Sequence, residues 1–140
     1  MVIRHILLAL IASALSACDV VSTSYPNRGE ATANGQIANG WLPEIIPSSA
    51  TEIETNNDLD LNVSWGKFKY AKANHREFFA QLSLPSRTSP FENWQETLAE
   101  HQARGFEIGE YAEVQQVWVF FCSKAVAKCE YRMWLERRNG

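Results

Sequence analysis

The sequence predicts a small α+β domain, with an antiparallel sheet of about three strands and helices packed on one face. Three observations support this fold class. Stretches near residues 59–71 and 114–136 alternate apolar and polar residues, which is typical of half-buried strands. The segment 90–104 carries both start and stop signals of an amphipathic helix. Finally, two cysteines lie close together near the C-terminus, where they could cross-link a hairpin.

The N-terminal segment has the composition of an export signal. Arg4 gives it a cationic start, an apolar run follows from Ile6 to Ala14, and small residues come next. This run is too short to cross a bilayer, which takes roughly 20 residues of helix. We therefore predict that residues 1–17 are a signal peptide and take no part in the fold.

Leu15-Ser16-Ala17-Cys18 closes this segment. The four residues resemble the lipobox of bacterial lipoproteins. The resemblance implies a diacylglycerol on the Cys18 thiol, cleavage before Cys18, and a protein anchored to the cell membrane or outer membrane of a Gram-negative bacterium, facing the periplasm. Two or three acyl chains give stable anchoring, where one does not. Asp19 follows at a position where aspartate is a sorting signal in enterobacterial lipoproteins, which slightly favours the inner membrane. An ordinary signal peptide with a coincidental cysteine is the alternative.

Residues 18–40 are predicted to form the lipidated cysteine and a flexible tether. The stretch from Asp19 to Gly40 is rich in Ser, Thr, Asn and Gly and shows no helix or strand period. A chain of this length would reach roughly 25 Å. Residues 41–140 are then predicted to form a single globular domain.

The first elements of this domain are read from proline, capping residues and alternation. Residues 41–47 contain two prolines, so we expect an extended segment. Ser49 and Glu52 form a capping box that predicts a short helix ending near Thr55. Alternation from residue 59 to 71 predicts a strand. Because its apolar phase changes at Gly66, we expect a β-bulge there.

Two further helices are expected before the C-terminal strands. Asn74 offers a helix start and Pro85 breaks the pattern that follows. Ser89 and Pro90 give the clearest start signal in the chain, and Gly105 gives a stop. The predicted helix 90–104 would bury Phe91, Trp94 and Leu98.

The C-terminal segments 114–122 and 129–136 are predicted to form a hairpin with Cys122 opposite Cys129. In this register aromatic residues face aromatic or apolar ones, with Phe120 opposite Tyr131 and Trp118 opposite Met133. We expect this cysteine face to lie against the helices.

Cys122 and Cys129 are predicted to form a structural disulfide, because the envelope is oxidising and Cys18 is lipidated. A redox-active pair is the alternative, but the spacing is not C-x-x-C. A zinc site would need more ligands than His75 and His101 supply, and the calcium-loop pattern that starts at Asp58 is incomplete. We predict no metal and no cofactor.

Charge and motifs limit the possible functions. Arg4 is the one charged residue in residues 1–17, so removing them leaves 12 of the 13 Lys and Arg against 16 Asp and Glu. This acidic balance disfavours nucleic-acid binding. No nucleophile motif of a hydrolase is present, so we expect a protein that is not an enzyme and has no catalytic residues.

The predicted function is binding of another envelope protein, as an assembly accessory, a hydrolase inhibitor or an immunity-type protein. Large aromatic residues beside charges, or a run of acids, could supply the interface. The candidate interface residues are Trp134, Trp41, Glu107, Glu110 and Glu113. The alternative is a small-ligand or cell-wall binding module with an aromatic-lined pocket near His75 or His101.

Overall fold

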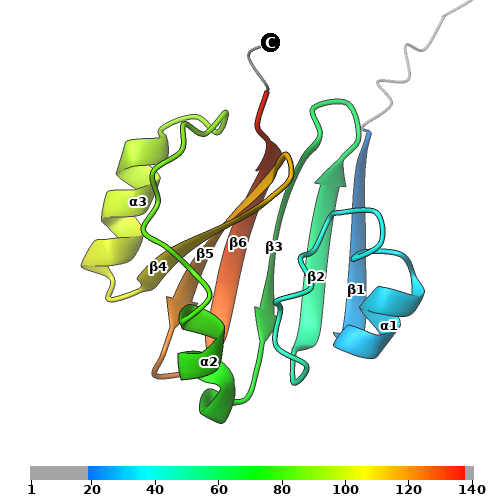
Figure 1. Ribbon diagram of the computed structural model, residues 1–140, viewed down its shortest axis with the longest axis horizontal. Helices are drawn as coiled ribbons and strands as arrows, with labels where there is room; N and C mark the ends of the chain where they lie inside the picture. The colour runs from blue at the N-terminus through cyan, green and yellow to red at the C-terminus, as the bar shows by residue number, and fades with distance from the viewer. Residues whose placement is uncertain (1–18, 138–140) are drawn as a thin grey trace, which may run out of the picture.

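The computed structural model describes residues 19–137, which form a six-stranded antiparallel sheet in the order β1-β2-β3-β6-β5-β4 (Figure 1). The strands are β1 (Val20–Asn27), β2 (Thr51–Asp58), β3 (Val63–Lys69), β4 (Glu107–Glu113), β5 (Gln116–Ser123) and β6 (Lys128–Leu135). The helices are α1 (Arg28–Ala33), the 3-10 helix η1 (Lys72–Asn74), α2 (His75–Phe79) and α3 (Trp94–Ala103). The fold is therefore mostly β, and the predicted α+β domain with a three-stranded sheet is wrong.

The sheet consists of two three-stranded meanders placed side by side. The first meander is β1-β2-β3 and the second is β4-β5-β6, and the antiparallel pair β3 and β6 joins them. The segment between β3 and β4 supplies η1, α2 and α3. Because all pairs are antiparallel, short turns suffice within each meander.

The predicted flexible tether is wrong, since residues 20–33 form β1 and α1. β1 pairs with β2 from Val20 to Asn27. The polar residues that suggested a tether are used in local hydrogen bonds. Asn27 caps α1 by accepting from the amide of Glu30, and Gln36 donates to the buried Tyr25 hydroxyl at 3.0 Å. A polar composition therefore fits an edge strand whose hydrogen bonds are satisfied.

The C-terminal hairpin is confirmed in the predicted register. Cys122 lies opposite Cys129 and the two form a disulfide. Phe120 faces Tyr131, and Trp118 faces Met133. This cysteine face belongs to the larger core, which also contains Phe78 of α2. The hairpin was predictable because a one-residue shift would have placed charged residues in the core.

Helices cover both faces of the sheet, not one face as predicted. α1, α2 and the loop between α1 and β2 contribute to the core on the cysteine face. α3 covers the opposite face over the second meander (Figure 1), where Trp94 packs against Trp134 at 5.5 Å between ring centroids. β5 is consequently buried on both faces from Val117 to Cys122.

Two local predictions in the first meander are also wrong. Residues 51–58 form β2, and the capping box at Ser49 starts no helix. Residues 59–62 form the β2–β3 turn, so the predicted strand 59–71 is reduced to Val63–Lys69. The bulge lies in β2, between Thr51 and Glu54, and not at Gly66. Gly66 allows close packing instead, since a Cβ there would lie 2.0 Å from the Glu54 carbonyl oxygen.

The helix expected over 90–104 exists as α3, although it begins at Trp94. Its end follows the prediction: Gly105 has a φ of +82°, and the amide of Phe106 donates to the carbonyl of His101. The second expected helix corresponds to η1 and α2. Trp94 is buried, and Phe91 and Leu98 pack at the edge of the smaller core.

Candidate interaction surface

Half of one sheet face carries no helix. α3 covers this face over the second meander and the start of β3, whereas β1, β2, the end of β3 and the start of β6 are left without a helix on the same side. Side chains from four strands meet on this surface, which we call the open face. Its polar residues are Ser24, Glu52, Glu54, Lys67, Lys69 and Lys128.

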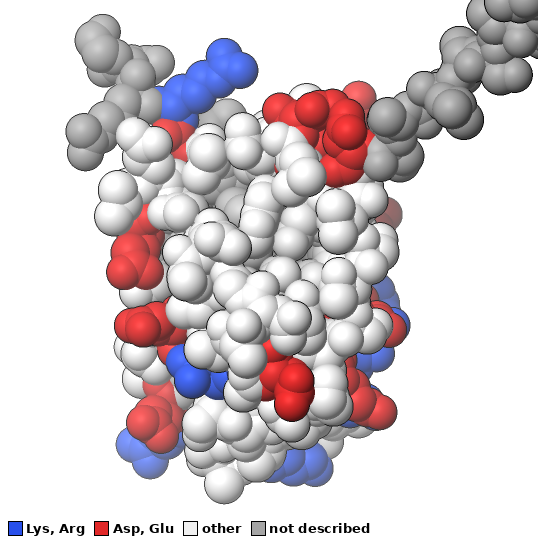
Figure 2. Space-filling view, turned by 90° about the vertical axis from the view of Figure 1, so that its right-hand side faces the viewer, with Lys and Arg blue, Asp and Glu red and all other residues white. Residues whose placement is uncertain are grey.

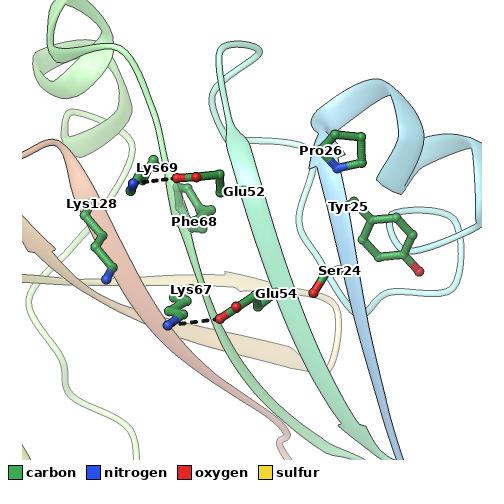
Figure 3. Close-up of a pocket in the computed structure, with 9 residues that line it drawn as sticks. All are labelled: Ser24, Tyr25, Pro26, Glu52, Glu54, Lys67, Phe68, Lys69 and Lys128. Atoms are coloured by element: carbon green, nitrogen blue, oxygen red, sulfur yellow. Dashed lines mark ion pairs between the residues drawn. The ribbon is translucent and has the colours of Figure 1, made fainter.

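Two ion pairs cross between β2 and β3 on the open face (Figure 3). Lys69 Nζ lies 2.6 Å from Glu52 Oε2, and Lys67 Nζ lies 3.1 Å from Glu54 Oε2. All four side chains are about half exposed, so these pairs add little stability. Together with Pro26 they line a shallow hollow of about 530 Å³. The open face is thus an ordered charged surface that remains accessible.

The β2 bulge lies at this surface. Glu52 has a φ of +47°, an unusual backbone conformation for a residue with a side chain. The hydrogen bond and charge of Lys69 lower the pKa of the Glu52 carboxyl. Bulges often re-aim side chains next to functional sites. Glu52 is therefore the most strongly positioned acid of the open face.

One cation of the open face is available to a partner. Lys128 lies beside Lys69 in the β3–β6 register, and within residues 19–137 it has no carboxylate within ion-pair distance. Three lysines therefore face two glutamates here. The adjoining β1 has no charged residue and is an edge strand, because it pairs with β2 alone. The side of the molecule at the β1 edge accordingly shows few charges at its centre (Figure 2).

One comparison with known proteins concerns the strands that form most of this surface. Residues 19–69 match the family model of the YbbD head domain. The matched segment comprises β1, α1, β2 and β3, which is the whole first meander and most of the open face. No curated protein and no solved structure matches the chain. The similarity therefore concerns the first meander.

The two tryptophans predicted as interface anchors, Trp134 and Trp41, do not lie on the open face. Trp134 is 2 % exposed and packs among Phe91, Trp94 and Val63 in the smaller core, so it offers no surface. Trp41 is partly buried against the larger core, and its carbonyl oxygen accepts a hydrogen bond from Trp118 Nε1 at 3.0 Å. Trp134 was misplaced because α3 covers the second face of the hairpin.

The acidic residues of β4 form no continuous rim. Glu110 is 1 % exposed, and its carboxylate accepts from the Arg87 guanidinium and from the amides of Ser86 and Arg87. Glu107 accepts a hydrogen bond from His75 at 2.7 Å, and Glu113 is exposed at the end of the strand. Neighbouring strand residues point to opposite faces, which separates Glu110 from the other two.

Both histidines of the described chain are buried and engaged. His75 bonds Glu107 through Nε2 and the Tyr70 hydroxyl through Nδ1. Burial, with the charge of Glu107, raises the pKa of Tyr70 to about 12, which keeps its hydroxyl protonated. His101 bonds Glu130 at 2.8 Å and the carbonyl of Thr97 at 2.7 Å. The acidic partner of each histidine therefore comes from a strand far away in the sequence, β4 for His75 and β6 for His101.

In residues 19–137 no group of three or more His, Cys, Asp or Glu is placed to hold a metal ion. Nor is any helix in that part of the chain both long and apolar enough to span a bilayer. Cys18, the predicted lipidation site, lies outside the described residues.

A second hollow lies between α2 and α3, with a volume of about 600 Å³. Its walls are mostly apolar, and the carboxylate of Glu107 is its one charged group. The residues that line it are Phe79, Leu84, Pro85, Leu98, Gln102, Phe106, Glu107 and Ile108. This hollow is the feature that a small amphipathic ligand would fit best.

The sequence reasoning missed the open face. Glu52 and Glu54 were assigned to a short helix, and Lys67 and Lys69 to the polar side of a strand, none of them with a binding role. The sequence contains two short runs in which charged residues alternate with apolar ones. The first run is acidic, with Glu52 and Glu54, and the second is basic, with Lys67 and Lys69. The runs gained meaning once β2 and β3 were known to pair.

Proposed function

We propose that this chain is an envelope lipoprotein, without enzymatic activity, whose folded domain binds another envelope protein through the open face. The lipidated residue would be Cys18, and the membrane would be its first partner. The observation that carries the proposal is the uncovered part of one sheet face, with its ordered ion pairs and with Lys128, which has no acidic partner among the described residues. We propose no nucleic-acid partner and no cofactor.

The anchor rests on the sequence of residues 15–18. Leu, Ser, Ala and Cys occupy the four lipobox positions directly after an apolar run. A lipid on Cys18 would hold the protein at a membrane surface without a spanning helix. Asp19 favours the inner membrane over the outer membrane, facing the periplasm in either case.

The open face has the chemistry of a protein-binding surface. Ion pairs already formed in the free protein hold charges in fixed positions, which gives specificity and speeds encounter with a complementary surface. The adjoining β1 edge offers backbone groups to an added strand. A partner with an acidic patch opposite Lys69 and Lys128, and an extended segment along β1, would satisfy both features.

The non-enzymatic part of the proposal is supported by the state of the buried polar groups. Each described histidine is buried with both ring nitrogens hydrogen-bonded within the fold, so neither ring presents a free nitrogen to a bound substrate. The buried Glu110 is likewise bonded to Arg87 and backbone amides.

A small-ligand module is the second candidate function. It would use the hollow between α2 and α3, where Glu107 would bind a cationic group and Phe79 and Phe106 would contact an apolar one. Titration with amphipathic amines would shift the NMR signals of this hollow if the second candidate held.

Crosslinking in cells tests the proposed function. A photoreactive residue replaces Lys67 on the open face or, as a matched control, Gln95 on the exposed side of α3. We expect one protein to be captured from position 67 and not from position 95, because only the first probe would lie in the interface. Equal capture at both positions, or capture of cell-wall fragments alone, would contradict the proposal.

A further inference from the structure

In the proposed lipoprotein, Asp19 alone separates the lipidated Cys18 from the start of β1. Asp19 is the first described residue, and β1 starts at Val20. The carbonyl oxygen of Asp19 accepts a hydrogen bond from the amide of Leu59 at 3.1 Å, which ties the chain to the β2–β3 turn. Consecutive Cα atoms are only about 3.8 Å apart across a peptide bond. A lipid on Cys18 would therefore hold this turn at the membrane surface.

The β2–β3 turn presents two leucines to solvent. Leu59 is 51 % exposed and Leu61 is 71 % exposed. Asp58 Oδ1 accepts hydrogen bonds from the amides of Asp60 and Leu61, at 3.1 and 2.9 Å, which fixes the turn. Exposed apolar side chains mark a contact site when they lie together in one patch and not when they are scattered singly.

Further apolar groups lie at the same end of the sheet. The antiparallel register places the β4–β5 turn, with the exposed Val114, and the end of β6, with Leu135, at this end. Trp41 shares a small hollow with Leu135 and Asn62. Tryptophan prefers the boundary between headgroups and water. The apolar character therefore extends over several segments.

Resting on the lipid anchor of the proposed function, we infer that this end of the domain lies directly on a bilayer of zwitterionic lipid. Leu59 and Leu61 insert among the headgroups. The bilayer is the occupant because the lipidated residue adjoins Asp19, whose carbonyl is bonded to the turn itself.

The acidic residues beside the β2–β3 turn indicate which lipid headgroups this end of the sheet would contact. Asp58 and Asp60 flank Leu59 in the turn, Asp19 lies within hydrogen-bond distance of Asp60, and acidic side chains gather at this end of the molecule (Figure 2). Asp19 raises the pKa of the Asp60 carboxyl through a shared hydrogen bond and through its negative charge. Anionic headgroups would be repelled by this cluster, so zwitterionic headgroups fit it better.

The orientation places the open face in a defined position. Lys69 and Lys128 lie at the opposite end of the strands, one β3 length away. Seven strand residues span about 23 Å. The basic end of the open face therefore projects away from the membrane, toward a partner in the aqueous compartment.

The test uses the full lipidated protein in phosphatidylcholine vesicles that contain a nitroxide-labelled lipid as a quencher. An environment-sensitive thiol probe is attached at Leu61→Cys or, as a matched control, at Val126→Cys in the β5–β6 turn. Val126 is 66 % exposed and lies at the opposite end of the sheet. Cys122 and Cys129 are buried in a disulfide, so they do not react with the probe.

We expect the probe at position 61 to shift to shorter wavelength and to be quenched several-fold more than the probe at position 126. Vesicles with added anionic lipid should reduce this difference. Flotation with the vesicles and a lipid mass on Cys18, with both probes equally unquenched, would overturn the inference and leave the anchor intact. Equal quenching at both positions would overturn it too. An unmodified Cys18 and no flotation would overturn the anchor itself, and the membrane contact with it.

Discussion

Replacing Trp134 by alanine should lower the free energy of unfolding of residues 19–140 by about 4 kcal/mol. The side chain is 2 % exposed and packs against Trp94 and Phe91, with ring centroids 5.5 and 6.3 Å away. Its removal leaves a large cavity between α3 and the hairpin, and the surrounding strands cannot close it. Urea denaturation followed by circular dichroism measures the change.

Trp134→Phe is the matched control for this prediction. The Nε1–H group of Trp134 is buried, and within the described chain it has no hydrogen-bond acceptor. Phenylalanine removes that unsatisfied donor and keeps an aromatic ring, so the loss should be only roughly 1–2 kcal/mol. Unchanged stability of Trp134→Ala would instead indicate an exposed interface residue and would contradict its place in the core.

Glu110→Ala should destabilise the domain by about 3 kcal/mol. The carboxylate organises the loop after α2: it lies 2.6 Å from Arg87 Nη1 and accepts from the amide of Ser86. The backbone of Glu110 also pairs with Ser83, so this loop covers the β4 edge. Without the carboxylate, two amides lose their acceptor and Arg87 keeps only Glu136. This loss of stability is at the lower end of the range for breaking a buried ion pair, because the Arg87 side chain is partly exposed.

Glu113→Ala provides the comparison, since Glu113 belongs to the same strand but is exposed. Its removal should change the free energy of unfolding by less than about 0.5 kcal/mol. Thermal unfolding of both variants side by side separates the two residues. Equal stability of the two variants would mean that the β4 acids act as one surface, as the sequence alone suggested.

The C-terminal hairpin was predictable because its pattern allows one register. Its residues are apolar on both sides of β5, and each one-residue shift places Glu130 or Arg132 against an aromatic residue. The helix at 94–103 was predictable in its end and its buried Trp94, whereas its start was placed four residues too early, at Pro90. Where local signals and long-range pairing agreed, the sequence sufficed.

The first meander was missed because its signals are weak or conflicting. β1 is an edge strand with one strongly buried side chain, Tyr25, and its composition also fits a loop. The capping box at Ser49 has the correct residues for a helix, but pairing of β2 with two strands outweighs it. The change of phase at Gly66 arises because Val63 and Phe68 belong to different cores on opposite faces.

The sequence indicated that the candidate site would be a charged surface, but it did not indicate which strands carry that surface. The expectation of a charged binding surface survives as a proposal, whereas its location moves from β4 and Trp134 to β2, β3 and β6. No local pattern indicates which sheet face lacks a helix, because that depends on where α3 packs. The open face became visible only when Glu52 and Lys69 were found on paired strands.

The proposed binding role is tested most directly by a charge exchange on the open face. The double variant Glu52→Lys/Lys69→Glu keeps an ion pair in place and reverses the charges presented to a partner, with stability changed by less than about 0.5 kcal/mol. The measurement is the affinity of the protein captured from position 67 for this variant, with Glu96→Lys on α3 as control. The account predicts an affinity reduced by about tenfold or more in the exchange variant and unchanged in the control. An exchange variant that binds as tightly as the natural chain would contradict it.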